Sequence, residues 1–245
     1  MTWTELQAAL KERNEAGRRV DFWWRDDDAS APSPALERAV GLSKKYGVPL
    51  ALAVIPQDAT PQLFEGLHER VTVLQHGTDH RNRAAAGEKK TEYPAAEPAG
   101  AALKRIETGM AKLGSVASQK FIPVLAPPWN RMRQDLLDKL PGIGIRGISA
   151  YGPQQSHEPA PGLRQVNTHV DVVAWRRGKR FVGEDEVLIS TLRHLRSIEG
   201  PIGWLTHHAV HDAATWGFLE RLFTLRGVRW LSAAEAFSYT APAHG

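Results

Sequence analysis

Residues 71–80 read VTVLQHGTDH, a short apolar run followed directly by a polar cluster. The run Val71 to Leu74 is rich in β-branched residues and is typical of a buried strand. His76 and His80 are four residues apart and project to the same side of a helical turn. Two imidazoles and a carboxylate are the ligand set of catalytic zinc and related divalent sites, although two surface histidines in a loop would give the same pattern.

A second apolar run, Val20 to Trp24, also ends in polar residues, the consecutive acids Asp26, Asp27 and Asp28. Such a triplet is found in helix caps and solvated turns, but its position after an apolar run matches that of the histidine pair. The acids therefore favour a metal site over two unrelated surface histidines.

Apolar runs alternate with amphipathic helical stretches along the whole chain. We predict strands at 20–24, 48–55, 71–74, 121–125, 143–149, 166–173, 202–206 and 228–231, and helices at 34–46, 60–70, 99–113, 132–140, 185–198 and 213–225. This alternation predicts a parallel sheet, and about seven or eight units in one chain favour a barrel over an open doubly wound sheet. We expect an α/β fold of the distorted (β/α)7-type barrel, a single domain over residues 1–245 with its core at 20–240.

Composition narrows the chemistry of the chain. It contains no cysteine, which excludes disulfides and thiolate ligands, so a metal must be held by His, Asp and Glu. The formal net charge is +4, with 31 basic residues dispersed among 27 acidic ones. The densest basic cluster, Arg176 to Arg180 (RRGKR), is typical of a solvated loop, and we expect no nucleic-acid partner.

The chain start carries Glu5 and the charged run Lys11 to Arg13 where a signal peptide has its apolar region. No stretch approaches the roughly 18 apolar residues of a transmembrane helix. We therefore expect a cytoplasmic protein with no membrane partner, and we leave its oligomeric state open. Residues 81–100 are expected to form a mobile loop beside the histidine pair, and 151–162 a second long loop.

Five short segments, each near the end of a predicted strand, resemble in order the motifs of the polysaccharide deacetylase family, carbohydrate esterase family 4. They are Arg25 to Ala29 (RDDDA), His76 to His80 (HGTDH), Ala126 to Trp129 (APPW), Asp171 to Trp175 (DVVAW) and Leu205 to His207 (LTH). Members of that family have a distorted (β/α)7 barrel, and barrel active sites gather at the carboxyl ends of the strands. The resemblance, which spans residues 20–212, implies a metal-dependent hydrolase of non-peptide carbon–nitrogen bonds that deacetylates an N-acetylated sugar or sugar conjugate.

The resemblance implies a role for each acid and histidine of the first two segments. Asp27 would be the general base that activates water. Asp28, His76 and His80 would bind a divalent metal, for which we expect zinc. The triplet leaves a second register open, with Asp26 as base and Asp27 as ligand, and we favour Asp27 and Asp28 because Ala29 replaces the small residue that ends the motif.

The other three segments would supply the acid and the substrate groove. His207 would be the general acid, oriented by Asp171, although the adjacent His208 leaves this assignment open. Pro128 and Trp129 would lie at the substrate, with backbone near Trp129 holding the oxyanion, and Trp175 would line the groove.

The third segment departs from the family pattern. Ala126 stands where the family usually has an arginine that pairs with the catalytic base. Asp27 would then lack its partner unless Arg25 or Arg131 reaches it.

Three other functions compete with sugar deacetylation. The same groups would serve an amidohydrolase acting on a small non-sugar amide. A catalytically silent sugar-binding barrel is favoured by Ala126 and disfavoured by retention of both proton-transfer residues. An iron oxygenase with a His/His/Asp site is disfavoured because those sites usually lie on antiparallel double-sheet folds.

Overall fold

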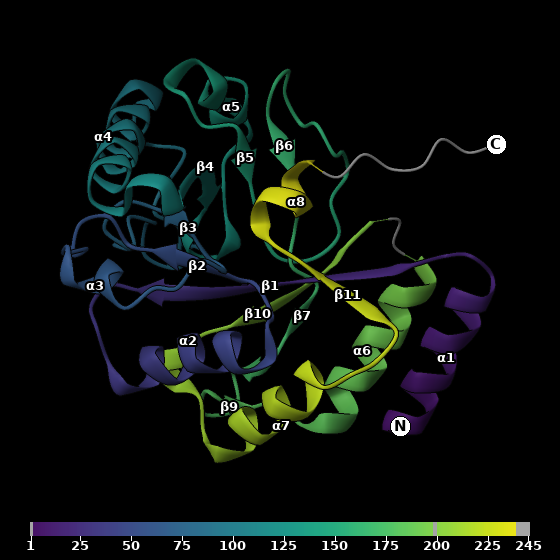
Figure 1. The fold of residues 1–245 in the computed structure, drawn as a ribbon. Helices are drawn as coiled ribbons and strands as arrows, with labels where there is room; N and C mark the ends of the chain where they lie inside the picture. The colour runs from purple at the N-terminus through teal and green to yellow at the C-terminus, as the bar shows by residue number, and fades with distance from the viewer. Residues whose placement is uncertain (1, 198–199, 239–245) are drawn as a thin grey trace.

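One curled parallel sheet organises the protein (Figure 1). The computed structural model describes residues 2–197 and 200–238, and in this part of the chain the sheet has nine strands in the order β6-β5-β4-β3-β2-β1-β10-β7, with β11 beside β1. The strands are β1 (Val20–Ala29), β2 (Leu50–Val54), β3 (Val71–His76), β4 (Phe121–Ala126), β5 (Gly147–Ile148), β6 (Arg164–Gln165), β7 (Val170–Asp171), β10 (Ile202–Thr206) and β11 (Val228–Leu231). Each except β6 lies within or overlaps a predicted apolar run, and β6 ends one residue before the run predicted at 166–173.

Residues 164–171 bridge the two edges of the sheet. The start of this segment, β6, pairs with β5, and its end, β7, pairs with β10. Between them, Thr168 N–H donates to Ala150 O (3.0 Å) and His169 N–H donates to Gly203 O (2.7 Å). With β6 and β7 counted as one interrupted strand, the ring contains seven strands, β1 to β5, β6/β7 and β10, which confirms the predicted distorted barrel.

Helices flank the sheet as the βα alternation requires. They are α1 (Trp3–Glu15), α2 (Pro34–Tyr46), α3 (Gln62–Glu65), α4 (Ala99–Ala117), α5 (Gln134–Leu137), α6 (Glu184–Ser197), α7 (Ala213–Phe223) and α8 (Ala233–Ser238), with 3-10 turns at η1 (Ser118–Lys120), η2 (Pro128–Asn130), η3 (Leu140–Ile143) and η4 (His208–Val210). In Figure 1, α2, α6 and α7 lie on one side of β1 and α8 lies on the other. Among the described helices, none has the length and apolar character needed to cross a bilayer.

The β1 strand separates two cores because its side chains alternate between the two faces of the sheet. Phe22 and Trp24 pack in the large core beneath the outer helices. Trp23 packs on the inner face among small side chains that include Ala51 and Ala53. This inner face is where a long polar side chain from β1 finds room.

Candidate active site

The carboxyl ends of the strands bring the predicted site residues together. Asp26 in β1 pairs with Thr206 in β10, and Leu205 pairs with Asp171 in β7. The acids at the carboxyl end of β1 therefore lie beside the histidines that follow β10. His76 ends β3, two strands from β1 in the sheet. This is the end of the sheet at which barrel enzymes place their active sites.

Asp28, His76 and His80 form a triad at this end, and their ligand atoms lie within 4.8 Å of one another. The Oδ1 atom of Asp28 is 3.0 Å from Nε2 of His76 and 3.2 Å from Nε2 of His80. Burial acts to raise the pKa of Asp28, but the contacts with the two imidazoles outweigh it and hold that pKa well below its ordinary value.

The donor set fits a divalent cation. The Nδ1 atom of His76 lies 3.0 Å from Ala126 O, and as a donor there it leaves Nε2 as a lone pair directed toward Asp28. The buried Oδ1 of Asp28 has no hydrogen-bond partner among the described residues. Two ligand atoms of a tetrahedral zinc site are about 3.3 Å apart, close to the spacing observed here. The triad can therefore hold a metal and leave positions open for water and substrate.

Arg25 pairs with Asp27, which resolves the question raised by Ala126. Its Nη2 donates to Asp27 Oδ2 (2.9 Å), and its Nε lies 2.8 Å from Oδ1. The guanidinium is fully buried and is held from behind by Ser149, whose Oγ and main-chain oxygen accept from Nη1 at 2.6 and 2.8 Å. Asn130 Oδ1 accepts from Nη2 as well (2.9 Å). Of the two arginines considered from the sequence, Arg25 makes this contact.

Asp26 and His208 lie behind the site and pair with each other. Their side chains, Oδ1 and Nδ1, are 2.5 Å apart, and Asp26 Oδ2 accepts from the Thr206 hydroxyl (2.5 Å) and from the His208 N–H (3.0 Å). Asp26 is fully buried on the face of β1 that does not carry Asp27. This arrangement supports Asp27 and Asp28, in place of Asp26 and Asp27, as the pair facing the site.

His207 faces the site from the other side. Its Nε2 lies 4.0 Å from Asp27 Oδ2, and the ring of Trp175 meets it edge-on, with centroids 4.6 Å apart. Asp171 accepts hydrogen bonds from Trp175 Nε1 (2.8 Å) and Val173 N–H (2.9 Å), and no hydrogen bond joins it to His207 in the described structure. Burial raises the pKa of Asp171, and the nearby His207 acts in the opposite direction. The described structure therefore shows no direct contact by which Asp171 would orient His207, and Trp175 is the residue that contacts both.

Two tryptophans flank these histidines. Trp129 packs on His80 with ring centroids 4.6 Å apart, and Trp175 is 41% exposed while it contacts His207. Pro128, which precedes Trp129, is buried. Aromatic side chains thus stand on both sides of the polar groups, with Trp175 exposed and Trp129 half-buried.

Backbone strain is concentrated at the site. Of the six described non-glycine residues with positive φ, four belong to it: Asp28, His80, Trp129 and Asn130. Each such residue costs about 1–3 kcal/mol and persists only where the surroundings hold it. The strained backbone therefore lies at the end of β1 and in the turns after β3 and β4, where it sets the positions of these side chains.

Glu92 supports the histidine loop and was not predicted from the sequence. Its Oε1 accepts from the N–H groups of Thr78 (2.9 Å) and Asp79 (3.3 Å), and burial raises its pKa. Asp79, predicted only as part of the motif, pairs with Arg83 at 2.6 and 2.8 Å. The segment expected to be a mobile loop is thus anchored at its middle, with Glu92 and Tyr93 buried. A lone acid in a polar loop carries no sequence signal for this role.

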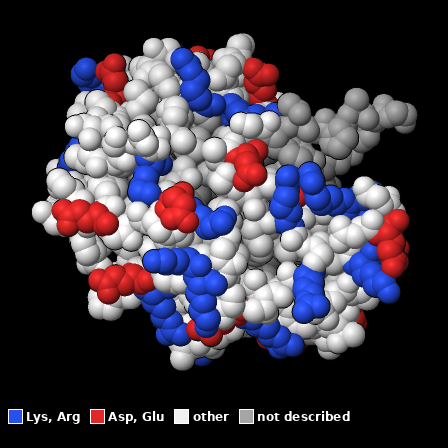
Figure 2. All heavy atoms as spheres, in the orientation of Figure 1, with Lys and Arg blue, Asp and Glu red and all other residues white. Residues whose placement is uncertain are grey.

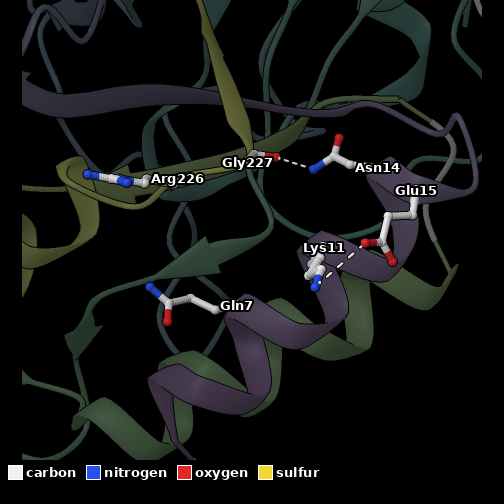
Figure 3. A pocket seen from close by; sticks show the side chains of 6 residues that line it. All are labelled: Gln7, Lys11, Asn14, Glu15, Arg226 and Gly227. Atoms are coloured by element: carbon white, nitrogen blue, oxygen red, sulfur yellow. Dashed lines mark hydrogen bonds and ion pairs between the residues drawn. The ribbon is translucent and has the colours of Figure 1, made fainter.

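A surface pocket of about 460 Å³ lies between α1 and the start of β11. Figure 3 shows its lining residues, including Lys11, Asn14 and Arg226, with Asn14 Nδ2 donating to Gly227 O (2.8 Å). Gly227 precedes β11 at the amino ends of the strands, so this pocket is at the opposite end of the sheet from the site.

Solved structures share the fold of this chain. A peptidoglycan N-acetylglucosamine deacetylase, Bc1960, has a TM-score of 0.58 and 14% identity over 91% of this chain and 90% of its own. An acetyl xylan esterase of family 4 from Clostridium thermocellum, with a cobalt ion, has a TM-score of 0.55 and 12% identity over 89% and 90%. A mutant of BA3943, a family pseudoenzyme with restored activity, has a TM-score of 0.59 and 14% identity over 89% and 67%.

No family model matches the sequence, and no curated protein matches it. At these low identities, the structural likeness establishes the fold. The chain has the fold of the family 4 carbohydrate esterases across about nine-tenths of its length, as the five segments predicted, and it carries an Asp–His–His triad that can hold a metal.

Proposed function

We propose that the chain is a divergent family 4 deacetylase that hydrolyses the acetamide of an N-acetylated sugar or sugar conjugate. The observation that carries this proposal is the Asp28, His76 and His80 triad lying next to Asp27 and His207 at the carboxyl ends of the strands. A metal position, a carboxylate and an imidazole on adjacent sides of one site are the groups that amide hydrolysis requires.

The chain's own residues would carry the two proton transfers. Asp27, held by Arg25, would accept a proton from the attacking water while the water oxygen bonds to the acetyl carbon. His207 would donate a proton to the amine nitrogen as the carbon–nitrogen bond breaks, which releases acetate and the free amino sugar. Each proton transfer typically raises the rate by about 10²- to 10⁴-fold. The backbone near Trp129 would hold the oxyanion.

Asp28, His76 and His80 would hold the metal, which we propose to be zinc. When bound, it would polarise the acetyl carbonyl and lower the pKa of a coordinated water toward about 7. The hydrogen bond from His76 to Ala126 O supports this role because metal-binding histidines are usually oriented in this way.

Two of the competing functions differ from the proposal in ways that can be measured. A silent sugar-binding barrel was favoured by the missing arginine at Ala126, and the contact of Arg25 with Asp27 removes that support. An amidohydrolase for small amides would use the same groups, and the exposed Trp175 favours a sugar over a small amide. A cytoplasmic location stays a prediction, and localisation of a tagged full-length chain would test it.

Acetate release from a panel of substrates tests the proposal. The panel contains N-acetylated sugars, an O-acetylated sugar and small amides, each with zinc, cobalt or manganese supplied. We expect metal-dependent release from N-acetylated sugars. Release only from small amides would identify the amidohydrolase, and sugar binding without release would identify the silent barrel.

Single-residue variants test the roles. Asp27→Asn should retain the metal and lose most turnover, whereas Asp28→Asn should lose metal affinity. His207→Ala should reduce turnover by about two to four orders of magnitude with unchanged metal content. Metal loss in Asp27→Asn would contradict the register, and near-normal turnover in His207→Ala beside a crippled but folded His208→Ala would contradict the choice of acid.

A further inference from the structure

A cationic hairpin adjoins the site. The strands β8 (Val173–Ala174) and β9 (Arg180–Phe181) pair in antiparallel fashion, and the turn between them is fully exposed. Residues 176–180 contain four cations, Arg176, Arg177, Lys179 and Arg180, and no acid.

Contacts with α7 and with Val172 hold the hairpin on the side of the site that carries His207. Phe181 N–H donates to Asp212 Oδ2 (3.1 Å), the cap of α7, and its ring packs on Phe218 at 5.1 Å. Val182 N–H donates to Val172 O (2.9 Å). Trp175, the residue before the cations, contacts His207 and donates to Asp171. The cations therefore begin one residue from the proposed groove.

Most of this charge is uncompensated. Arg177 pairs with Glu186 (2.5 Å), while Arg176, Lys179 and Arg180 have no acidic partner at ion-pair distance within the described residues. On the face drawn in Figure 2, Lys and Arg lie among Asp and Glu. A concentration of one sign beside an active site attracts ligands of the opposite sign.

We propose that this hairpin binds a phosphate group carried by the acetylated substrate, an inference that rests on the proposed deacetylase function. Guanidinium groups match the geometry of phosphate oxygens, and several adjacent cations suit a group that carries up to about two negative charges better than a single carboxylate. The sugar ring would lie against Trp175 with its acetamide toward the triad, and its phosphate would extend to the turn.

Three probes with the same acetamide test this inference. They are N-acetylglucosamine 1-phosphate, UDP-N-acetylglucosamine and neutral methyl N-acetylglucosaminide, with acetate release and calorimetric binding measured for each at low and high salt. We expect kcat/KM to be at least about tenfold higher for a phosphorylated sugar, with the preference reduced by salt. The better of the two phosphorylated probes distinguishes a sugar phosphate from a nucleoside diphosphate.

Two double variants that remove the same charge provide the control. Arg176→Gln with Lys179→Gln should raise KM for the phosphorylated sugar about tenfold and leave the neutral sugar unchanged. Lys44→Gln with Lys45→Gln, at the last turn of α2 and the amino ends of the strands, should change neither.

The outcomes separate the two proposals. Equal turnover of neutral and phosphorylated sugars, or equal losses in the two double variants, would overturn the phosphate site and leave the deacetylase intact. Hairpin-dependent binding of the phosphorylated sugar without acetate release would overturn the deacetylase and leave the phosphate site intact.

Discussion

At the scale of single residues, the site depends on one exchanged position. Ala126, the last residue of β4, stands where the family pattern has an arginine, and Arg25 supplies a guanidinium from β1. Ala51, the register neighbour of Arg25, and Ala53 are small and line the same inner face, which gives the arginine room. The contact between Arg25 and Asp27 supports Arg25 as the positioning residue for the proposed base.

Moving the arginine from position 25 to position 126 tests this exchange. Arg25→Ala should cost about a hundredfold in turnover at unchanged metal content because Asp27 loses the group that orients it. Adding Ala126→Arg to that variant should recover much of the activity, since the new side chain enters the volume that Arg25 vacated. Turnover, metal content and thermal unfolding are measured for both variants and for Arg25→Lys.

A purely structural role for Arg25 would give a different pattern. Removing one partner of a buried ion pair costs about 3–5 kcal/mol of stability, so Arg25→Ala is expected to unfold more easily. If Ala126→Arg restores stability without turnover, Arg25 supports the fold and does not position the base.

At the scale of elements, local signals determined how well the sequence predicted the structure. The predicted helix 34–46 is α2 to the residue because both ends carry strong signals: the Ser33 hydroxyl accepts from Leu36 N–H, and Gly47 adopts the left-handed conformation. The predicted helix 60–70 shortens to α3, which has no side-chain cap. The helix α1 was not predicted, although Thr2 and Glu5 form a capping box.

The motifs of the site could be predicted from the sequence, but the residues that hold those motifs in place could not. His76, His80 and Asp28 are near one another because strand ends converge, which the βα alternation already indicated. Arg25 reaches Asn130 and Glu92 reaches Thr78 across loops, between residues far apart in the sequence. Asn130 has a positive φ that asparagine adopts readily, whereas the positive φ of Trp129 is not expected from its residue type.

The loop after β3 leads to a prediction about glycine. Gly77 has a φ of 59°, and a Cβ there would lie 2.1 Å from Glu92 Oε2 and 2.5 Å from Pro128. Gly77→Ala should therefore displace Glu92 or the loop and weaken metal affinity by about ten- to a hundredfold, the range typical of lost support around a metal ligand. Metal affinity is measured by competition with a chelator.

Gly87→Ala is the matched control for this loop. Gly87 also has a positive φ, 85°, but a Cβ there would meet nothing within 4 Å. It should cost about 1 kcal/mol of stability and leave metal affinity unchanged. Equal metal affinity in both variants would show that Glu92 does not position the histidine loop.

At the scale of the whole molecule, the polar groups divide between the two faces of the sheet. Arg25 and Asp27 lie on the inner face, where the proposed reaction would take place. Asp26 and His208 lie on the other face, where they join β1 to the end of β10. The three consecutive acids thus have three different partners: His208 for Asp26, Arg25 for Asp27, and the histidine pair for Asp28. The pairing of Asp26 with His208 holds the backbone next to His207, the proposed acid.

Two histidines outside the proposed metal site, His169 and His211, should make the protein less stable in acid. Burial lowers the pKa of His169 to about 3 and that of His211 to about 4, with further lowering by neighbouring histidines. Between these values and an unfolded pKa near 6.5, the unfolded chain binds protons that the folded chain does not, so stability should fall as pH decreases. At pH 5 each histidine should cost about 2 kcal/mol relative to pH 8.

Denaturant unfolding of chelator-treated protein at pH 8 and pH 5 measures this effect without proton competition at the metal ligands. Gln in place of His169 does not titrate, so His169→Gln should lose less stability between the two pH values than the wild type does. The comparison uses each protein's own change with pH, because the substitution also removes the hydrogen bond that His169 Nδ1 accepts from Gly203 N–H (3.0 Å). An unchanged loss between pH 8 and pH 5 in the variant would contradict the assignment of acid sensitivity to this buried neutral imidazole.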